Sequence, residues 1–123
     1  MSRSVIFVAI GGMLGAVARF AAVELIAVLF PVTFPTGTFV VNILGSLVMG
    51  AAVGVSERYM IPADWRVFLT AGFCGGFTTM SSFAFENITL LIDRYYLTFA
   101  VYSTATFLAC LGAAFLGFVL TRP

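Results

Sequence analysis

Midway along one long apolar segment the chain reads Gly72-Phe73-Cys74-Gly75-Gly76-Phe77-Thr78-Thr79-Met80-Ser81-Ser82-Phe83. Glycine weakens a helix, so this composition predicts a break near Gly75-Gly76. Inside a membrane, broken backbone persists only where it is buried in protein or lines a wet cavity. Unwinding would free carbonyl groups, which attract a cation, and N–H groups, which attract an anion. The segment therefore predicts a small-ion site at membrane depth.

The composition of the whole chain is that of a membrane protein. Of its 123 residues, 62% are hydrophobic and 9% are charged, which excludes an ordinary soluble domain. The net charge of +1 argues against nucleic acid as a partner. The chain has no histidine, no CxxC metal pattern, no Ser/His/Asp set and no phosphate loop. We therefore expect no enzymatic activity and no catalytic residues.

Charges and prolines divide the chain into four hydrophobic segments within a single transmembrane domain, residues 1–123. These segments cover about residues 4–30, 36–57, 64–92 and 95–120, and each is long enough to span a bilayer. Four spans put both termini on one side of the membrane. Most arginines then lie on that side, which favours termini in the cytoplasm. The bias is slight, so insertion in both orientations is compatible with the sequence.

Small residues in the first two segments predict close helix packing. The pairs are Gly11-x-x-x-Gly15 and Gly50-x-x-x-Gly54. Packing within one bundle is the favoured interpretation of each pair, with dimerisation as the alternative. The small size of the chain is the stronger argument for an oligomer, because four helices can hardly shield a polar pathway from lipid on their own.

Polar side chains recur at helical spacing in the second and fourth segments. Thr38, Asn42 and Ser46 share one helix face, and the fourth segment has a matching stripe of Tyr102, Thr106 and Cys110. Polar groups in hydrocarbon usually face a bundle interior or a pathway. For Asn42, an interhelical hydrogen bond and a role in a pathway stay equally open. Together the two stripes predict a track of hydrogen-bond donors.

The third segment adds an aromatic ring and a charge beyond the break. Thr79, Phe83 and Glu86 share a face. A phenyl ring has a positive edge that Phe83 could offer to an anion, although such rings more often face lipid or core. Arg19 in the first segment could draw anions to a vestibule, and an ion pair with Glu86 is the alternative for both charges. These features favour a small ion over an organic substrate.

Three of the four segments carry motifs that resemble a known family. They are Gly11-Gly12-x-x-Gly15-Ala16-x-x-Arg19, Gly37-Thr38-x-x-x-Asn42-x-x-Gly45, and Gly72 to Thr79 continuing through Ser82-Phe83-x-x-Glu86. In order and spacing they look like the CrcB/Fluc fluoride channels. The resemblance implies a passive channel that exports fluoride from the cytoplasm. It also implies an antiparallel, dual-topology homodimer in a bacterial inner membrane, with two pores and a central structural sodium ion.

The resemblance also implies roles for individual residues. Backbone carbonyls of Gly75 and Thr78 would hold the sodium ion, and Arg19 would belong to a vestibule. The fluoride pore would be lined by Asn42, Phe83, Met80, Thr79, Ser82, Tyr102, Thr106 and Thr38.

Two positions depart from the family pattern. Met80 stands where the family usually has phenylalanine, and Ser82 where threonine is usual. A thioether can fill the space of a ring but lacks its positive edge. Either the second aromatic contact is dispensable, or Met80 changes permeation.

A proton-coupled exporter of small organic cations, similar to the small multidrug resistance family, is the alternative function. Such an exporter needs a carboxylate in the middle of the first helix, where this chain has Gly11 to Gly15. A structural subunit of a larger membrane complex is a third interpretation, and it predicts no transport by the purified protein.

Overall fold

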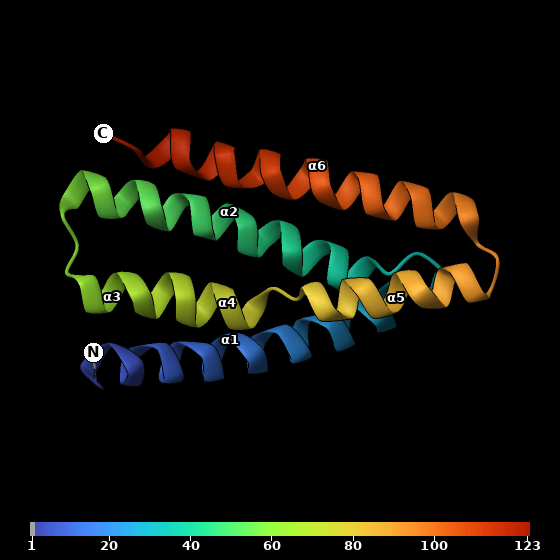
Figure 1. Ribbon diagram of the computed structural model, residues 1–123, viewed down its shortest axis with the longest axis horizontal. Coiled ribbons are helices and arrows are strands. Elements are labelled where there is room, and N and C mark those ends of the chain that lie inside the picture. The colour runs from blue at the N-terminus through green and yellow to red at the C-terminus, as the bar shows by residue number, and fades with distance from the viewer. Residues whose placement is uncertain (1) are drawn as a thin grey trace.

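The computed structural model describes residues 2–123, and over this range every element is a helix (Figure 1). Three elements are long and continuous: α1 (Ser2–Leu29), α2 (Thr36–Tyr59) and α6 (Tyr96–Thr121). The third segment is divided into α3 (Ala63–Val67), the π-helical η1 (Phe68–Cys74), α4 (Gly75–Phe77) and α5 (Met80–Ile92). All four segments are long and apolar enough to cross a membrane. This confirms the predicted all-α membrane architecture with an interrupted third span.

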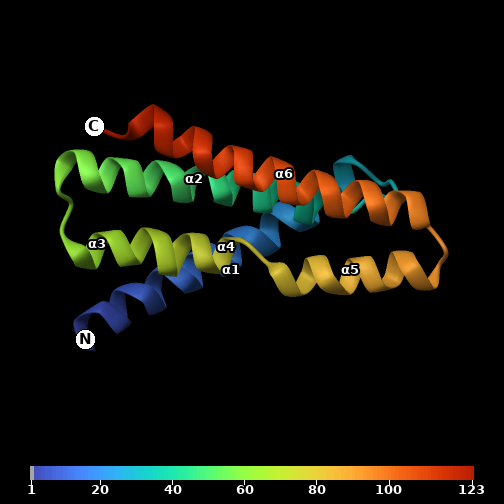
Figure 2. The ribbon, with the colours of Figure 1, turned by 45° about the horizontal axis from the view of Figure 1, so that its top comes forward.

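The helices lie side by side, with both termini and the α2–α3 turn at one end of the bundle (Figure 1). The α5–α6 turn lies at the opposite end. α2 packs along α6, while α1 packs against η1 and α4 and crosses them obliquely (Figure 2). The break between α4 and α5 therefore lies near the middle of the bundle.

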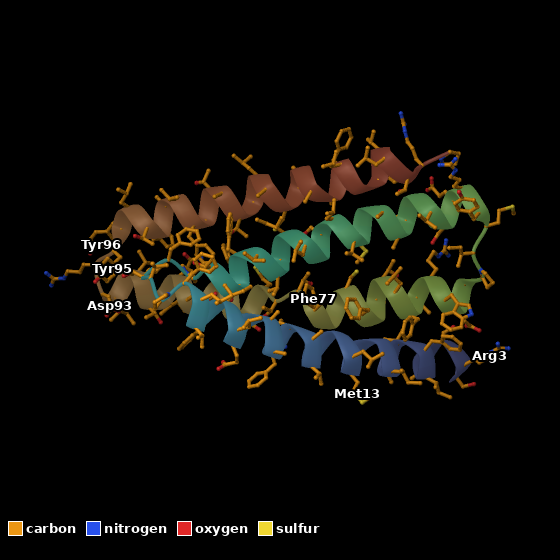
Figure 3. The ribbon with its side chains drawn as sticks, turned by 180° about the vertical axis from the view of Figure 1, so that it is seen from behind. Arg3, Met13, Phe77, Asp93, Tyr95 and Tyr96 are labelled. Carbon is orange, nitrogen blue, oxygen red and sulfur yellow. The ribbon has the colours of Figure 1, made fainter. Side chains whose placement is uncertain are left out.

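The two ends of the bundle are chemically distinct from its apolar sides. Figure 3 shows Arg3 at one end and Asp93, Tyr95 and Tyr96 at the other. Met13 points away from the bundle between these ends and is exposed. Charges and aromatic rings at both ends with apolar side chains between them match the layers of a bilayer.

The first glycine pair brings α1 against the third segment. A Cβ atom added at Gly11 or Gly15 would overlap the backbone carbonyls of Phe68 or Phe73, respectively. The second pair plays the same part between α2 and α6, where a Cβ at Gly50 would overlap the backbone of Ala114. Both pairs therefore pack helices within one bundle, as the favoured interpretation predicted.

The break lies near Gly75-Gly76, as predicted, but the two glycines are themselves helical and the extended residues begin two positions later. Gly75 is helical, with φ −61° and ψ −37°. The backbone is extended instead at Thr78 (φ −91°, ψ 157°) and Thr79 (φ −150°, ψ 110°). A Cβ at Gly76 would lie 2.5 Å from the carbonyl oxygen of Gly12. This glycine serves close helix packing, which requires a small residue but no unwinding.

Candidate functional site

The break is held open by a side chain from another helix. Asn42 of α2 accepts from the Thr79 N–H (Oδ1···N 2.8 Å) and donates to the Thr79 carbonyl (Nδ2···O 3.2 Å). An extended residue loses its helical partners, and a primary amide supplies both a donor and an acceptor to replace them. Asn42 therefore makes the interhelical hydrogen bonds that were one of its two predicted roles.

The second half-helix, α5, is capped at its start by Thr79 itself. The Thr79 hydroxyl accepts from the Ser82 N–H at 3.2 Å and is 3.1 Å from the Ser82 hydroxyl. Threonine is a favoured cap residue because its hydroxyl satisfies an otherwise free backbone donor. The backbone of Thr79 thus leaves the helical hydrogen bonding of α4, and its side chain caps the start of α5.

Two carbonyls before the break are left without helical donors. In an unbroken helix, those of Gly75 and Thr78 would accept from the N–H groups of Thr79 and Ser82. These two donors bond instead to Asn42 and to the Thr79 hydroxyl. Gly75 is also exposed. Free carbonyl oxygens are ligands that suit a hard cation, so these residues fit a cation site in their chemistry.

One of the carbonyls between Gly75 and Thr78, that of Gly76, accepts a hydrogen bond from the arginine of the first helix. Arg19 Nε donates to the Gly76 carbonyl oxygen at 3.0 Å. The guanidinium therefore stabilises the end of α4, where unsatisfied carbonyls give a partial negative charge. Arg19 also lines a hollow beside the break, described below, so its charge faces that hollow.

One cavity on the α6 side of the break has a volume of about 420 Å³. Its lining brings together five predicted pore residues: Asn42, Thr79, Met80, Phe83 and Thr106. Ser46, Thr78, Phe107, Cys110 and Leu111 complete the lining. None of these side chains is a formally charged acid or base. We call this space the α6 cavity.

Thr106 has an unusual environment in the α6 cavity. The residue is 9% exposed, and its hydroxyl oxygen has no hydrogen-bond partner among residues 2–123. A buried hydroxyl without a partner costs free energy, and each such group calls for an explanation such as a bound water or ion. Thr106 therefore lines the cavity and carries a buried hydroxyl that no described residue satisfies.

A second hollow of about 430 Å³ lies on the other side of Thr79. Its lining includes three predicted site residues besides Thr79: Arg19, Thr38 and Ser82. Ser81 and Glu86 add further polar groups, and Val23 and Phe85 are apolar. We call this space the Arg19 hollow. Most of the predicted site residues thus divide into two sets that meet at Thr79, whereas Tyr102 and Gly75 line neither space.

Glu86 connects three helices. Its carboxylate accepts from the Thr38 hydroxyl at 2.8 Å and from the Tyr102 hydroxyl at 2.9 Å. The alternative ion pair with Arg19 does not form: the single ion pair within residues 2–123 joins Arg3 to Asp64 (Nε···Oδ2 3.0 Å). That alternative for the two charges is therefore wrong.

The ring of Phe83 is positioned by Tyr102. Their centroids are 5.0 Å apart with an interplanar angle of 51°. Tyr102 is fully buried, and Phe34 presents an edge contact to it at 5.3 Å. Phe83 therefore has a supported orientation at the cavity wall, whereas the neighbouring Met80 is 74% exposed.

Some site residues were missing from the predicted set. Glu86 was considered for the face it shares with Phe83 and as a partner of Arg19 but not as a site residue, and Ser81 and Phe107 were not singled out. Glu86 receives its hydrogen bonds from two other helices, Thr38 of α2 and Tyr102 of α6. Only its position on a polar face of an apolar segment could have drawn attention to it.

Comparison with known proteins identifies the family. A family model described as CrcB-like protein, Camphor Resistance (CrcB), matches residues 6–118. A protein of Bacteroides fragilis named fluoride-specific ion channel FluC is 43% identical over 105 residues, or 81% of each chain. Proteins with the same name are 42% identical in Rhodospirillum rubrum (93% of this chain, 91% of the other) and 38% identical in Thermococcus onnurineus (98% and 97%). With four spans and these relatives, the chain is a multi-pass membrane protein that belongs to the CrcB family.

Proposed function

We propose that this protein is a passive, fluoride-selective ion channel that lets fluoride leave the cytoplasm through a bacterial inner membrane. The observation that carries the proposal is the α6 cavity beside the broken helix, whose lining combines uncharged polar side chains, the Phe83 ring and Thr106, a residue whose buried hydroxyl has no partner within residues 2–123. The names of the relatives point to the same ion.

The chemistry of the cavity suits fluoride. This ion is small and strongly hydrated, so a pathway has to replace its water with several donors at close range. Hydroxyl and amide groups do so without the strong trapping that a buried ammonium would cause. Hydrogen fluoride crosses membranes as a neutral acid and dissociates inside the cell. An open channel therefore drains the anion down its gradient, and no energy-coupling site is required.

The proposal includes an antiparallel homodimer with two pores. Met80 and Gly75 are exposed in the single chain although both lie next to the break. Irregular backbone and polar groups at membrane depth need protein cover. A second copy would supply that cover, and two equivalent cavities would then give two pores.

A central sodium ion also belongs to the proposal. The carbonyls of Gly75 and Thr78 would hold it, since their helical donors bond elsewhere. A fixed cation near the pathway would offset part of the cost of an anion in low dielectric. If the ion is structural, purification without sodium should dissociate the dimer, as measured by size-exclusion chromatography with light scattering. A dimer unchanged without sodium would remove the ion from the proposal.

The organic-cation exporter has less support. Its carboxylate belongs in the middle of the first helix, where Gly11 and Gly15 pack against the backbone of η1. A side chain at either glycine would overlap that backbone.

Ion efflux from liposomes tests the proposed function. Vesicles with purified protein should release fluoride rapidly and chloride hardly at all, as read by ion-selective electrodes. Equal release of both anions would overturn the selectivity. The same assay on Met80→Phe shows whether a second ring edge changes permeation.

A further inference from the structure

Helix α5 is not continuous with the helix on either side of it. Before α5, the extended residues Thr78 and Thr79 separate it from α4, so α4 does not determine how α5 is rotated about its own axis. After α5, the turn into α6 contains Arg94, whose φ of 64° ends the helical path. The placement of Phe83, which belongs to α5 and lines the α6 cavity, therefore depends on contacts between α5 and its neighbours.

Within residues 2–123, side-chain hydrogen bonds join α5 to other helices at two adjacent residues, Glu86 and Asn87. Glu86 accepts from Thr38 of α2 and from Tyr102 of α6. Asn87 Oδ1 accepts from the Ser103 hydroxyl of α6 at 3.3 Å. Asn87 is 7% exposed, so without Ser103 this buried oxygen would lose its partner. The contact between Asn87 and Ser103 had no place in the site predicted from the sequence.

The two bonds from α5 to α6 differ in the length of their side chains. Glu86 and Tyr102 are long, and the flexible Glu86 chain can follow small rotations of α5 without losing its partner. Asparagine has two side-chain torsions and serine has one, each confined to a few rotamers. A bond between two such short side chains forms only when the backbones are close and correctly rotated. The Asn87–Ser103 bond is therefore the more restrictive of the two.

This restrictive bond lies one helical turn from the ring at the cavity wall. Phe83 precedes Asn87 by four residues and shares its face of α5. Tyr102, whose ring centroid is 5.0 Å from that of Phe83, is the neighbour of Ser103 on α6. Neither Asn87 nor Ser103 lines the α6 cavity or the Arg19 hollow. Both residues can therefore act on an ion only through the side chains that they position.

We propose that Asn87 and Ser103 are positioning residues, whose hydrogen bond fixes the rotation of α5 against α6 and thereby the orientation of the Phe83 ring. This inference rests on the proposed function, because it concerns how that ring meets fluoride. A phenyl ring attracts an anion at its edge and repels it at its face, so a rotation of α5 changes what the cavity presents to the ion. Asn42 holds the backbone just before α5, and Asn87 holds the helix beyond the ring.

Fluorine NMR tests the positioning without any transport. With 4-fluorophenylalanine placed at Phe83 of the purified protein, Ser103→Ala should shift and broaden the ¹⁹F resonance. Ser103→Thr keeps the hydroxyl, and Thr104→Val removes an exposed hydroxyl from the next residue, so both should keep the native resonance. Asn87→Leu should cause the same change as Ser103→Ala, and the double variant should add nothing, because both remove one bond. A native resonance in Ser103→Ala would overturn the positioning role.

Efflux from liposomes tests the consequence for transport. Hydrogen bonds between membrane helices contribute about 0.6 kcal/mol on average, a factor of about three. Ser103→Ala should therefore lower fluoride efflux about threefold, while Ser103→Thr restores it and Thr104→Val leaves it native. A lower thermal midpoint in Ser103→Ala with native efflux would show that the bond is only structural. If the native protein releases no fluoride, the proposed function fails, and the resonance of the labelled ring still decides whether Asn87 and Ser103 position it.

Discussion

Asn42 and Thr79, 37 residues apart in sequence, bond to each other in both directions across the helix bundle. The amide of Asn42 replaces the two helical partners that the extended backbone of Thr79 has lost. It also faces the α6 cavity. One side chain therefore maintains the break and lines the proposed pathway.

Replacing this amide should destabilise the fold. Asn42→Leu would leave the Thr79 N–H and carbonyl without partners, at a cost of about 1–3 kcal/mol for each group. Thermal unfolding in detergent should show a lower midpoint, and fluoride efflux should be lost. Ser46→Ala is the control for the thermal midpoint, because it removes a polar group from the same face one turn later. An unchanged midpoint in Asn42→Leu would mean that the break does not depend on Asn42.

Removing the Thr106 hydroxyl should slow fluoride transport without lowering the stability of the fold. Thr106→Val keeps the side-chain shape and deletes a buried group with no partner, so the thermal midpoint should stay constant or rise. A hydrogen bond to an ion contributes about 1.5–3 kcal/mol, so fluoride efflux should slow by roughly tenfold or more. Thr104→Val, an exposed position on the same helix, should leave efflux unchanged. Native efflux in Thr106→Val would take this hydroxyl out of the pathway.

The ring at the cavity wall should matter for flux. Phe83→Ile deletes the positive ring edge but leaves an apolar side chain, so fluoride efflux should fall strongly. Phe115→Ile, an exposed ring on α6 that does not line the α6 cavity, is the matched control. Equal efflux in both variants would show that Phe83 has no contact with the anion.

Close packing between α1 and the third segment should tolerate no added methyl group. Gly15→Ala would overlap the Phe73 carbonyl, and overpacking of this kind costs about 1–3 kcal/mol. Gly112→Ala has nothing within 4 Å of the new atom, and it should raise helix stability by about 0.5–1 kcal/mol. Thermal unfolding of the two variants in detergent should shift in opposite directions. Equal shifts would mean that α1 can move away from η1 without penalty.

The weak charge bias should be visible in membrane orientation. Arg3 is paired with Asp64, and the remaining arginines are few. Terminal tags on the native protein should therefore be labelled from both sides of the membrane in intact cells. A single orientation would contradict the proposed antiparallel dimer.

Local features of the chain were enough to predict much of the molecule. Apolar segment length identified the spans, and helical spacing placed Asn42 and Thr106 on polar faces. The glycine pairs were rightly assigned to packing within one bundle. The presence of an interruption in the third segment was also predictable, because glycines and hydroxyls cluster there.

The same features predicted the region of the interruption but not the residues at which the backbone is extended. Gly75 and Gly76 weaken a helix in isolation, yet both remain helical in the folded chain, and Gly76 meets the α1 backbone closely. Thr79 is extended because Asn42 is placed to bond its backbone. Propensity describes one residue and its neighbours, whereas this outcome depends on contacts between helices.

The class of the protein follows from the sequence alone, because the apolar length of a span and the period of a helix are local properties of a chain in a bilayer. The residues at which the third helix breaks, the carbonyls that it frees, and the bonding of Glu86 to Thr38 and Tyr102 rather than Arg19 depend on how the helices pack. Each of these is a choice of hydrogen-bond partner between helices. In an apolar medium a polar group bonds to whatever donor or acceptor the packed helices bring within reach, and that proximity exists only after the helices have assembled.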